Sequence, residues 1–122
     1  MKIAIPVESN QLNADVHNSF GRAPYFLIYD SETHDGTFVN NSAAASSGGA
    51  GIKAAQIIVD SGASVLLTPR CGEKAADVLQ LAEIELYKTK AISAQENIAA
   101  FEAGQLKTLD EIHAGFHGHG DN

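Results

Sequence analysis

The first 41 residues have the alternating and continuous apolar patterns of β-strands. Residues 2–7 form a short apolar run rich in β-branched side chains, and residues 25–30 form a second run with more aromatic side chains. Both runs are typical of strands. The polar stretch 31–36 ends in glycine and predicts a hairpin loop, with residues 37–41 as the returning strand. We therefore expect three consecutive antiparallel strands.

From residue 49 onward, segments of helical period alternate with short apolar runs. Helices are expected over residues 49–63, 71–83 and 93–106, with strands at residues 64–69 and 84–90 between them. The core positions expected in the first two helices are Ile52, Ala55, Ile58, Val59, Ala75, Val78, Leu79 and Leu81. The predicted element order is βββαβαβα.

Glycine and serine positions predict where these helices begin and end. Gly62 is expected to end the first helix and Gly104 the third, because glycine adopts the left-handed conformation that commonly follows a helix. Ser93 is expected to cap the third helix, with Glu96 at the capping-box position. These signals support the helical interpretation of the second half of the chain.

The element order predicts one α/β domain with a mixed sheet. Right-handed crossovers would make the later strands parallel to the first and place helices over the sheet. We see no linker or internal repeat, and we expect one domain over residues 1–110 followed by a mobile, His-rich tail over residues 111–122.

Composition and charge restrict the classes of partner. The 122 residues contain 8 Lys and Arg against 15 Asp and Glu, for a formal charge of −7, which argues against nucleic acid or an anionic membrane as partner. Neither a signal peptide nor a run of membrane-spanning length is apparent, so a cytoplasmic protein is expected. The single cysteine excludes an internal disulfide and cannot alone supply the four thiolates that usually hold an iron-sulfur cluster.

The predicted strand directions collect four loops at one edge of the sheet. These loops contain Asn18 to Ala23 and residues 45–51, 68–72 and 88–93. Helix N-termini would direct N–H groups to the same edge, where ligands of open α/β sheets bind. The cations expected there are Arg22, Arg70, Lys74, Lys53 and Lys90. We therefore expect a local anion-binding rim, with Arg22 as its main cation; the alternative is that Arg22 pairs with Asp15 or Glu8.

The glycine-rich loop and the cysteine each allow two interpretations. The stretch "SSGGAG" lacks the Walker lysine and does not follow the first strand, so it is either a flexible start of the first helix or a source of backbone N–H groups for a ligand. Cys71 follows Arg70 at an expected helix N-terminus, which favours a thiolate that could bind a soft metal or act as a nucleophile. Inert packing is the alternative. A phosphatase loop is excluded because position 77 is aspartate.

Histidines are the remaining candidate metal ligands. His17 could bind a metal or a ligand, or be a solvated loop residue. His113, His117 and His119 form a tract suited to Zn, Cu or Ni, unless the tail binds metals only nonspecifically. No Ser-His-Asp pattern or motif-like carboxylate pair is present, so a non-enzymatic protein is expected.

Several blocks in this order resemble a known family. The blocks "MKIAIPV", "HNSFGRAPYFLIYD", "GGAGIKAAQIIVDSGASVLLT" and "CGEKAADVL", within roughly residues 1–107, resemble the dinitrogenase iron-molybdenum cofactor biosynthesis family of NifX- and NafY-like proteins. The resemblance implies a ribonuclease H-like three-layer α/β/α fold with a five-stranded mixed sheet, without nuclease activity. It also implies binding, storage or delivery of metal-sulfide clusters, including molybdenum with iron or copper.

The resemblance also implies which residues bind. The family's FGRAP loop falls on Phe20, Gly21, Arg22, Ala23 and Pro24, and its glycine-rich loop falls on Gly48, Gly49, Ala50 and Gly51. Many members have histidine before Phe-Gly, where this chain has Ser19 with His17 two residues earlier. Many also have a Gly-Pro-Asn-Ala-like start of the second helix, where this chain has Cys71 and Gly72.

The expected function is therefore cluster binding at the rim. Arg22, Arg70 and the two loops would supply charge and N–H donors, and Cys71, His17 or the tail histidines would supply direct ligands. The alternative is a regulatory or scaffold domain that binds an anionic metabolite or a partner ATPase of cluster assembly. A monomer or weak homodimer is expected.

Overall fold

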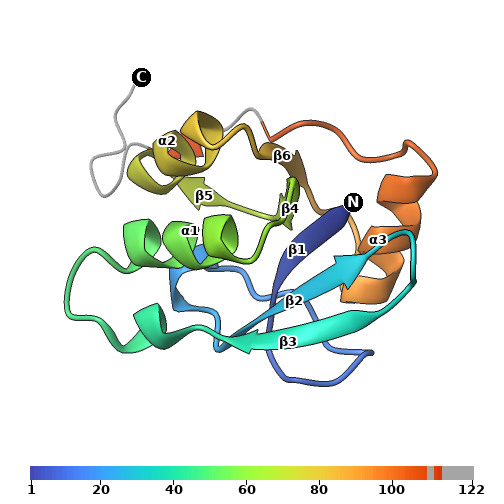
Figure 1. Cartoon of the computed structure of the whole chain (residues 1–122), viewed down its shortest axis with the longest axis horizontal. Coiled ribbons are helices and arrows are strands. Elements are labelled where there is room, and N and C mark those ends of the chain that lie inside the picture. The colour runs from blue at the N-terminus through green and yellow to red at the C-terminus, as the bar shows by residue number, and fades with distance from the viewer. Residues whose placement is uncertain (110–111, 114–122) are drawn as a thin grey trace.

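A computed structural model describes residues 1–109 and 112–113 of the chain and has three layers (Figure 1). The central sheet has the strand order β3-β2-β1-β4-β6. Its strands are β1 (Lys2–Val7), β2 (Tyr25–Asp30), β3 (Gly36–Asn40), β4 (Val65–Thr68) and β6 (Glu85–Lys88). The helices are α1 (Ala50–Asp60), α2 (Glu73–Leu81) and α3 (Ala94–Glu102). The predicted three-layer α/β class with a five-stranded mixed sheet is confirmed.

Strand directions bring four strand ends to one edge of the sheet. β2 is antiparallel to β1 and to β3, whereas β4 is parallel to β1 and to β6. β1, β3, β4 and β6 therefore run the same way, and their carboxyl ends lie at a common edge. We call this edge the carboxyl edge. It is the edge that the sequence pattern predicted for the four loops.

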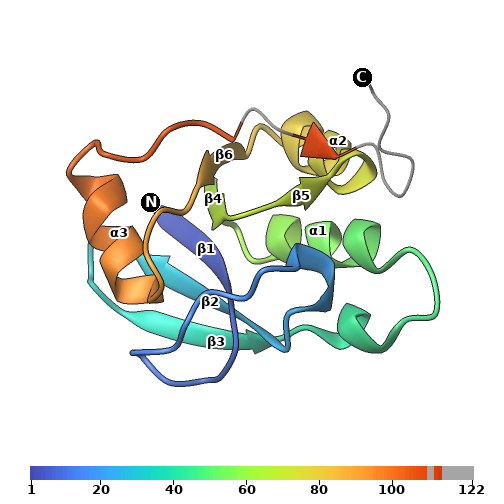
Figure 2. The same cartoon turned by 180° about the vertical axis from the view of Figure 1, so that it is seen from behind.

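The two faces of the sheet carry separate cores. α1 and α2 cover one face, where Phe26, Leu66, Ile58 and Leu79 are buried. α3 covers part of the other face, where Ile5, Leu27 and Ile98 are buried (Figures 1 and 2). The alternation of side chains along β1 and β2 divides their apolar residues between these two cores. The buried residues of α1 and α2 thus belong to one core, and those of α3 belong to the other.

Two expected core positions in the helices are wrong. Ile52 is 42 % exposed and Leu81 is 86 % exposed, while Ala54 and Ala76 are buried. α1 and α2 pack closely against each other, and close packing of two helices selects small side chains at the contact. The largest apolar residues of each helix were therefore a poor guide to its buried face.

The predicted helix ends are confirmed by backbone geometry. Gly62 and Gly104 have φ values of 81° and 72° directly beyond α1 and α3. The Ser93 hydroxyl accepts the N–H of Glu96 at 3.1 Å and donates to its carboxylate at 3.0 Å. Ser93 is thus the side-chain cap of α3, as the sequence indicates.

A second, two-stranded sheet lies outside the predicted order. β5 (Cys71–Gly72) pairs in parallel with β7 (Ile112–His113). Residues 112 and 113 belong to the segment 111–122 that is expected to be a mobile tail, and their backbone is paired with β5. The mobility of the tail stays a prediction. His117 and His119 lie outside the described residues. In the described part of the chain, no helix is long and apolar enough to cross a membrane.

Candidate anion-binding site

The loop after β1 and the loop after β3 are tied together by Arg22. This residue ends the 3₁₀ turn η1 (Phe20–Arg22), and the second loop contains the 3₁₀ turn η2 (Ser42–Ala45). One terminal nitrogen, Nη1, donates to the carbonyl oxygens of Ala44 at 2.8 Å and Ser46 at 2.7 Å. The side chain remains exposed. Within the described residues the guanidinium has no further partner, so its remaining N–H groups can donate to a ligand there.

Asn41 makes the reciprocal tie from the second loop to the first. Its side chain is 5 % exposed, and its Nδ2 donates to the carbonyl oxygens of Gly21 at 3.2 Å and Ala23 at 2.8 Å. Its Oδ1 accepts the N–H of Ala43 at 3.1 Å. Together, Arg22 and Asn41 hold η1 and η2 against each other.

Gly21 allows η1 to lie directly on the start of α1. A Cβ atom at Gly21 would lie 3.0 Å from the backbone nitrogen of Gly51 and 3.1 Å from its Cα atom. Contacts of this length are tighter than nine in ten of those that real Cβ atoms make, so the backbone of Gly51 would have to shift by a few tenths of an ångström. The glycine of the FGRAP loop thus lets η1 lie against the first turn of α1 without displacing its backbone.

We expect Gly21→Ala to destabilise the fold by about 1–3 kcal/mol, because the added methyl group must displace the backbone of α1. Gly48→Ala is the matched control, since a Cβ there would meet nothing within 4 Å. Urea unfolding measures both. Equal midpoints for the two variants would contradict the close approach.

Two helix N-termini lie side by side at the carboxyl edge. α1 begins after Gly49 (φ 70°) and α2 after Gly72, and neither glycine supplies a capping side chain. A Cβ atom at Gly51 would lie 3.5 Å from the Cβ of Ala75, so the first turns of α1 and α2 are neighbours. The third expected N-terminus differs, because Ser93 caps α3. Two uncapped helix starts therefore direct N–H groups and positive dipole ends to this edge.

Lys53 adds a second cation beside Arg22. Its ammonium lies 3.3 Å from the hydroxyl of Ser46, whose carbonyl is bound by Arg22. Within residues 1–109, no carboxylate pairs with either cation, so the alternative pairing of Arg22 with Asp15 or Glu8 is not found. We call Arg22, Ser46, Lys53 and the first turn of α1 the Arg22–Lys53 site.

The other residues of the two family loops contribute through backbone or packing. Phe20 is 3 % exposed, and its ring centroid lies 5.3 Å from that of Phe26. Ala23 and Ala50 are also buried, whereas Gly48 and Gly49 are exposed. Arg22 is thus the side chain of the FGR turn that faces solvent.

The remaining expected cations lie in other parts of the edge. Arg70 and Lys74 are exposed around the start of α2, and Lys90 is exposed in the loop before α3. The backbone N–H of Lys90 donates to Asn97 of α3 at 2.9 Å, which fixes that loop to the layer on the opposite face.

The expected activation of Cys71 is wrong. Its side chain is 2 % exposed in the core beneath α1 and α2, and burial raises the pKa of the thiol from 9.0 to about 11. Desolvation disfavours the thiolate, which is the form that binds metals and attacks electrophiles. The position beside Arg70 at the start of a helix suggested a lowered pKa, because the sequence did not reveal that the thiol lies in the core with α1 and α2.

Alkylation of Cys71 in the folded protein is expected to be slow at pH 8 and to accelerate as the pH rises toward 11. A pKa of about 11 in place of 9.0 lowers the thiolate fraction at pH 8 by about 100-fold. Iodoacetamide labelling followed by mass spectrometry measures the rate. The chain unfolded in guanidinium is the control, and equal rates in both states would contradict the burial.

The ring nitrogen Nδ1 of His17 contacts the backbone of Ser19. Its Nδ1 accepts the N–H of Ser19 at 2.9 Å and lies 3.1 Å from the carbonyl oxygen of the same residue. Either tautomer therefore has a partner at Nδ1. In the described part of the chain, no group of three His, Cys, Asp or Glu side chains could hold a metal ion. His113 is described by its backbone alone.

Asn41 and Ser46 are the site residues that the sequence interpretation missed. Asn41 follows the end of β3 and precedes a short run of small residues. Asparagine is a preferred N-cap because its side-chain oxygen accepts a backbone N–H two or three residues onward. That signal was available for Asn41, whereas the contact of Ser46 with two cations depends on tertiary structure.

Comparisons with known proteins place these features in one family. The family model described as "Dinitrogenase iron-molybdenum cofactor" matches residues 1–104. The structure of the apo form of the orange protein from Desulfovibrio gigas is 35 % identical, with a TM-score of 0.85, and the match covers 89 % of this chain and 92 % of that protein.

Two further relatives cover nearly the whole chain. The NMR structure of a candidate NifB protein from Thermotoga is 32 % identical, with a TM-score of 0.81, over 93 % of this chain and 97 % of that protein. An uncharacterized protein of Methanocaldococcus jannaschii is 29 % identical over 113 residues, which are 90 % of this chain and 92 % of the relative. Similarity therefore extends over at least 90 % of this chain in both comparisons.

Proposed function

Because the chain belongs to the dinitrogenase iron-molybdenum cofactor family, we propose that it is a cytoplasmic, non-enzymatic protein that binds and delivers a metal-sulfide cluster. The cargo contains molybdenum with iron or copper, and it binds at the Arg22–Lys53 site. We assign the fold to the ribonuclease H-like class. The strand order β3-β2-β1-β4-β6, with only β2 reversed, supports this assignment.

The observation that carries the proposal is the local excess of positive charge in an acidic protein. The formal charge of the chain is −7, yet Arg22 and Lys53 meet at Ser46 beside an uncapped helix start. A metal-sulfide cluster is a polyanion, and guanidinium groups, ammonium groups and backbone N–H groups stabilise such a charge. Few covalent ligands are then needed, which suits a carrier that must release its cargo.

His17 is our proposed direct ligand in the same loop. While Nδ1 accepts the N–H of Ser19, the neutral ring carries its proton on Nε2. Metal binding at Nε2 would therefore move the proton to Nδ1, where the ring would donate to the carbonyl oxygen of Ser19 instead. A hydrogen bond from the second ring nitrogen to a carbonyl commonly orients a metal-binding histidine. Arg70 and the tail histidines His113, His117 and His119 remain proposed contributors, whereas the buried Cys71 does not suit this role.

Anaerobic purification followed by metal, sulfide and visible-absorption analysis tests the proposal. We expect molybdenum with iron or copper, acid-labile sulfide and sulfide-to-metal charge-transfer absorption. A chain that ends at Ala114 is the control for metal that the tail binds. A colourless protein that also fails to take up added cluster would contradict the carrier function and favour a scaffold that binds an anionic metabolite or a partner ATPase.

A further inference from the structure

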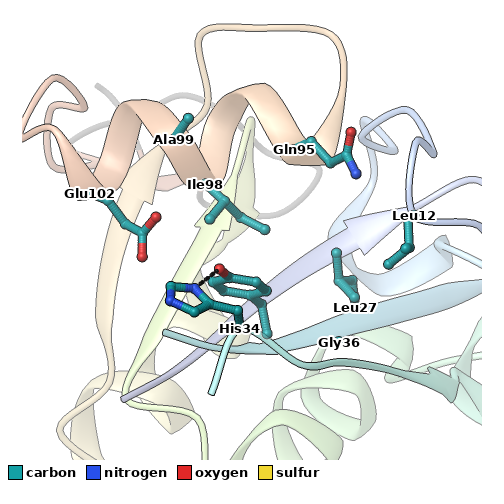
Figure 3. Close-up of a pocket in the computed structure, with 9 residues that line it drawn as sticks. Leu12, Leu27, His34, Gly36, Gln95, Ile98, Ala99 and Glu102 are labelled. Carbon is teal, nitrogen blue, oxygen red and sulfur yellow. Dashed lines mark hydrogen bonds between the residues drawn. The ribbon is translucent and has the colours of Figure 1, made fainter. Parts of the chain in front are cut away.

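The face of the sheet covered by α3 contains a pocket of about 320 Å³ (Figure 3). It lies between α3 and the β2–β3 hairpin, and the apolar side chains of Leu12, Leu27 and Ile98 line it. α3 packs over β1, so it leaves the outer strands β2 and β3 less covered on this face. The Arg22–Lys53 site belongs to the opposite face, with α1 and η1.

Gly36 keeps this pocket open on the hairpin side. A Cβ atom at Gly36 would lie 3.1 Å from Cδ1 of Leu27 and 3.6 Å from Cδ2 of Leu12. A side chain there would therefore occupy the space between the two leucines. The glycine at the start of β3 thus leaves an apolar surface accessible from the pocket.

The side chains at one end of the pocket are polar, and the β2–β3 hairpin holds them in position. The hydroxyl of Tyr29 lies 2.8 Å from Nδ1 of His34. His34 has a φ of 65°, a conformation that costs a non-glycine residue about 1–2 kcal/mol. Its backbone N–H donates to the carbonyl oxygen of Asp30 at 2.7 Å, which secures the turn. The fold therefore keeps an imidazole in a strained position beside a phenol at the pocket wall.

The charge at this end of the pocket is negative. Glu102 lines the pocket and makes no ion pair within the described residues, and no lysine or arginine is among the lining side chains. The nearby cationic terminus of Met1 pairs instead with Glu32 at 3.5 Å. Figure 3 shows the Glu102 carboxylate and the His34 ring at one end of the pocket, with Leu27 and Leu12 toward the other.

We propose that this pocket binds a small organic cation, with a primary ammonium group attached to an aromatic or branched aliphatic body. The ammonium would donate to the Glu102 carboxylate and to the Tyr29–His34 pair. The apolar body would pack on Leu12, Leu27 and Ile98. Small-molecule sites are usually lined by apolar side chains together with a few polar or charged groups. This pocket has that composition, with one charge at its polar end that is unpaired within the described residues. The volume suits a ligand of about ten non-hydrogen atoms.

Titration of the full chain with phenethylamine, followed by ¹H–¹⁵N NMR, tests this proposal. We expect saturable shifts at the amides of Gly36, Ile98 and Ala99. Glu102→Gln should weaken binding about fivefold, the upper range for an exposed ion pair. Glu83→Gln is the matched control, because it removes a carboxylate that does not line the pocket. 3-Phenylpropionate has a similar body with the opposite charge and should bind at least about tenfold more weakly.

Three results would overturn the proposal. They are the absence of saturable shifts at the pocket amides, equal affinity for the amine and the carboxylate, and equal affinity of the wild type and Glu102→Gln. Each result is independent of metal-sulfide binding, because the titration uses metal-free protein. The pocket can therefore fail as a cation site while the Arg22–Lys53 site binds its cluster.

Discussion

Replacement of Arg22 by alanine is expected to weaken the binding of an anionic metal-sulfide species by at least about tenfold, a loss of about 1.4 kcal/mol. The guanidinium supplies a permanent charge beside the uncapped start of α1, and its Nη1 holds the carbonyl oxygens of Ala44 and Ser46. Alanine therefore removes a ligand donor and loosens the η2 loop. Spectrophotometric titration of metal-free protein with tetrathiomolybdate, a sulfide dianion, measures the affinity.

Two further variants separate these contributions of Arg22. Arg22→Lys keeps the charge but cannot bind two carbonyl oxygens and a ligand through a planar fork, so an intermediate affinity is expected. Lys107→Ala removes an exposed cation elsewhere and should leave the affinity unchanged. If Lys107→Ala weakens binding as much as Arg22→Ala does, binding responds to net charge rather than to a site, and the proposed role of Arg22 is wrong.

Replacement of Asn41 by alanine is expected to give the largest loss of stability among the variants discussed, about 2–4 kcal/mol. The side chain is 5 % exposed and makes hydrogen bonds to Gly21, Ala23 and Ala43. Alanine leaves buried backbone groups without partners, and each such group costs about 1–3 kcal/mol. The shift of the urea unfolding midpoint, with an unchanged m-value, measures this loss.

Asn40→Ala is the matched control for Asn41→Ala, because Asn40 is exposed and is the last residue of β3, directly before Asn41. Asn41→Asp tests the donor alone, since a carboxylate still accepts the N–H of Ala43 but cannot donate to the carbonyl oxygens of Gly21 and Ala23. We expect Asn41→Asp to be nearly as unstable as Asn41→Ala. Equal stability of the variants at positions 40 and 41 would contradict the tie between η1 and η2.

The main strands, the helices and the carboxyl edge were predictable because their signals are local. The apolar runs of β1 and β2 are typical of strands, and the glycine beyond α1 is typical of a helix end. The strand directions follow from the short connections between the elements. The position of Arg22 in a loop at that edge was also predictable, since it follows β1 and stands between Gly21 and Ala23. Its partners were not, because they are carbonyl oxygens more than 20 residues away.

The features that sequence interpretation missed all depend on contacts between distant segments. Cys71 is buried because it lies in the core formed with α1, α2 and the sheet. Ile52 is exposed because α1 turns its alanines toward α2 and the sheet. Gly21 was expected as part of the FGRAP loop, but the sequence did not show that a Cβ atom there would lie 3.0 Å from the backbone nitrogen of Gly51. Periodicity and residue type carry no information about such pairs.

The central claim is that a metal-sulfide anion binds where η1, η2 and the start of α1 meet. Mapping of ¹H–¹⁵N NMR shifts on addition of tetrathiomolybdate to metal-free protein tests it most directly. We predict shifts at the Arg22 side-chain N–H and at the amides of Ser46, Gly49 and Gly51, with the amides of the α3 pocket unchanged. Saturable shifts that leave these four groups unaffected, or no binding at all, would contradict the account.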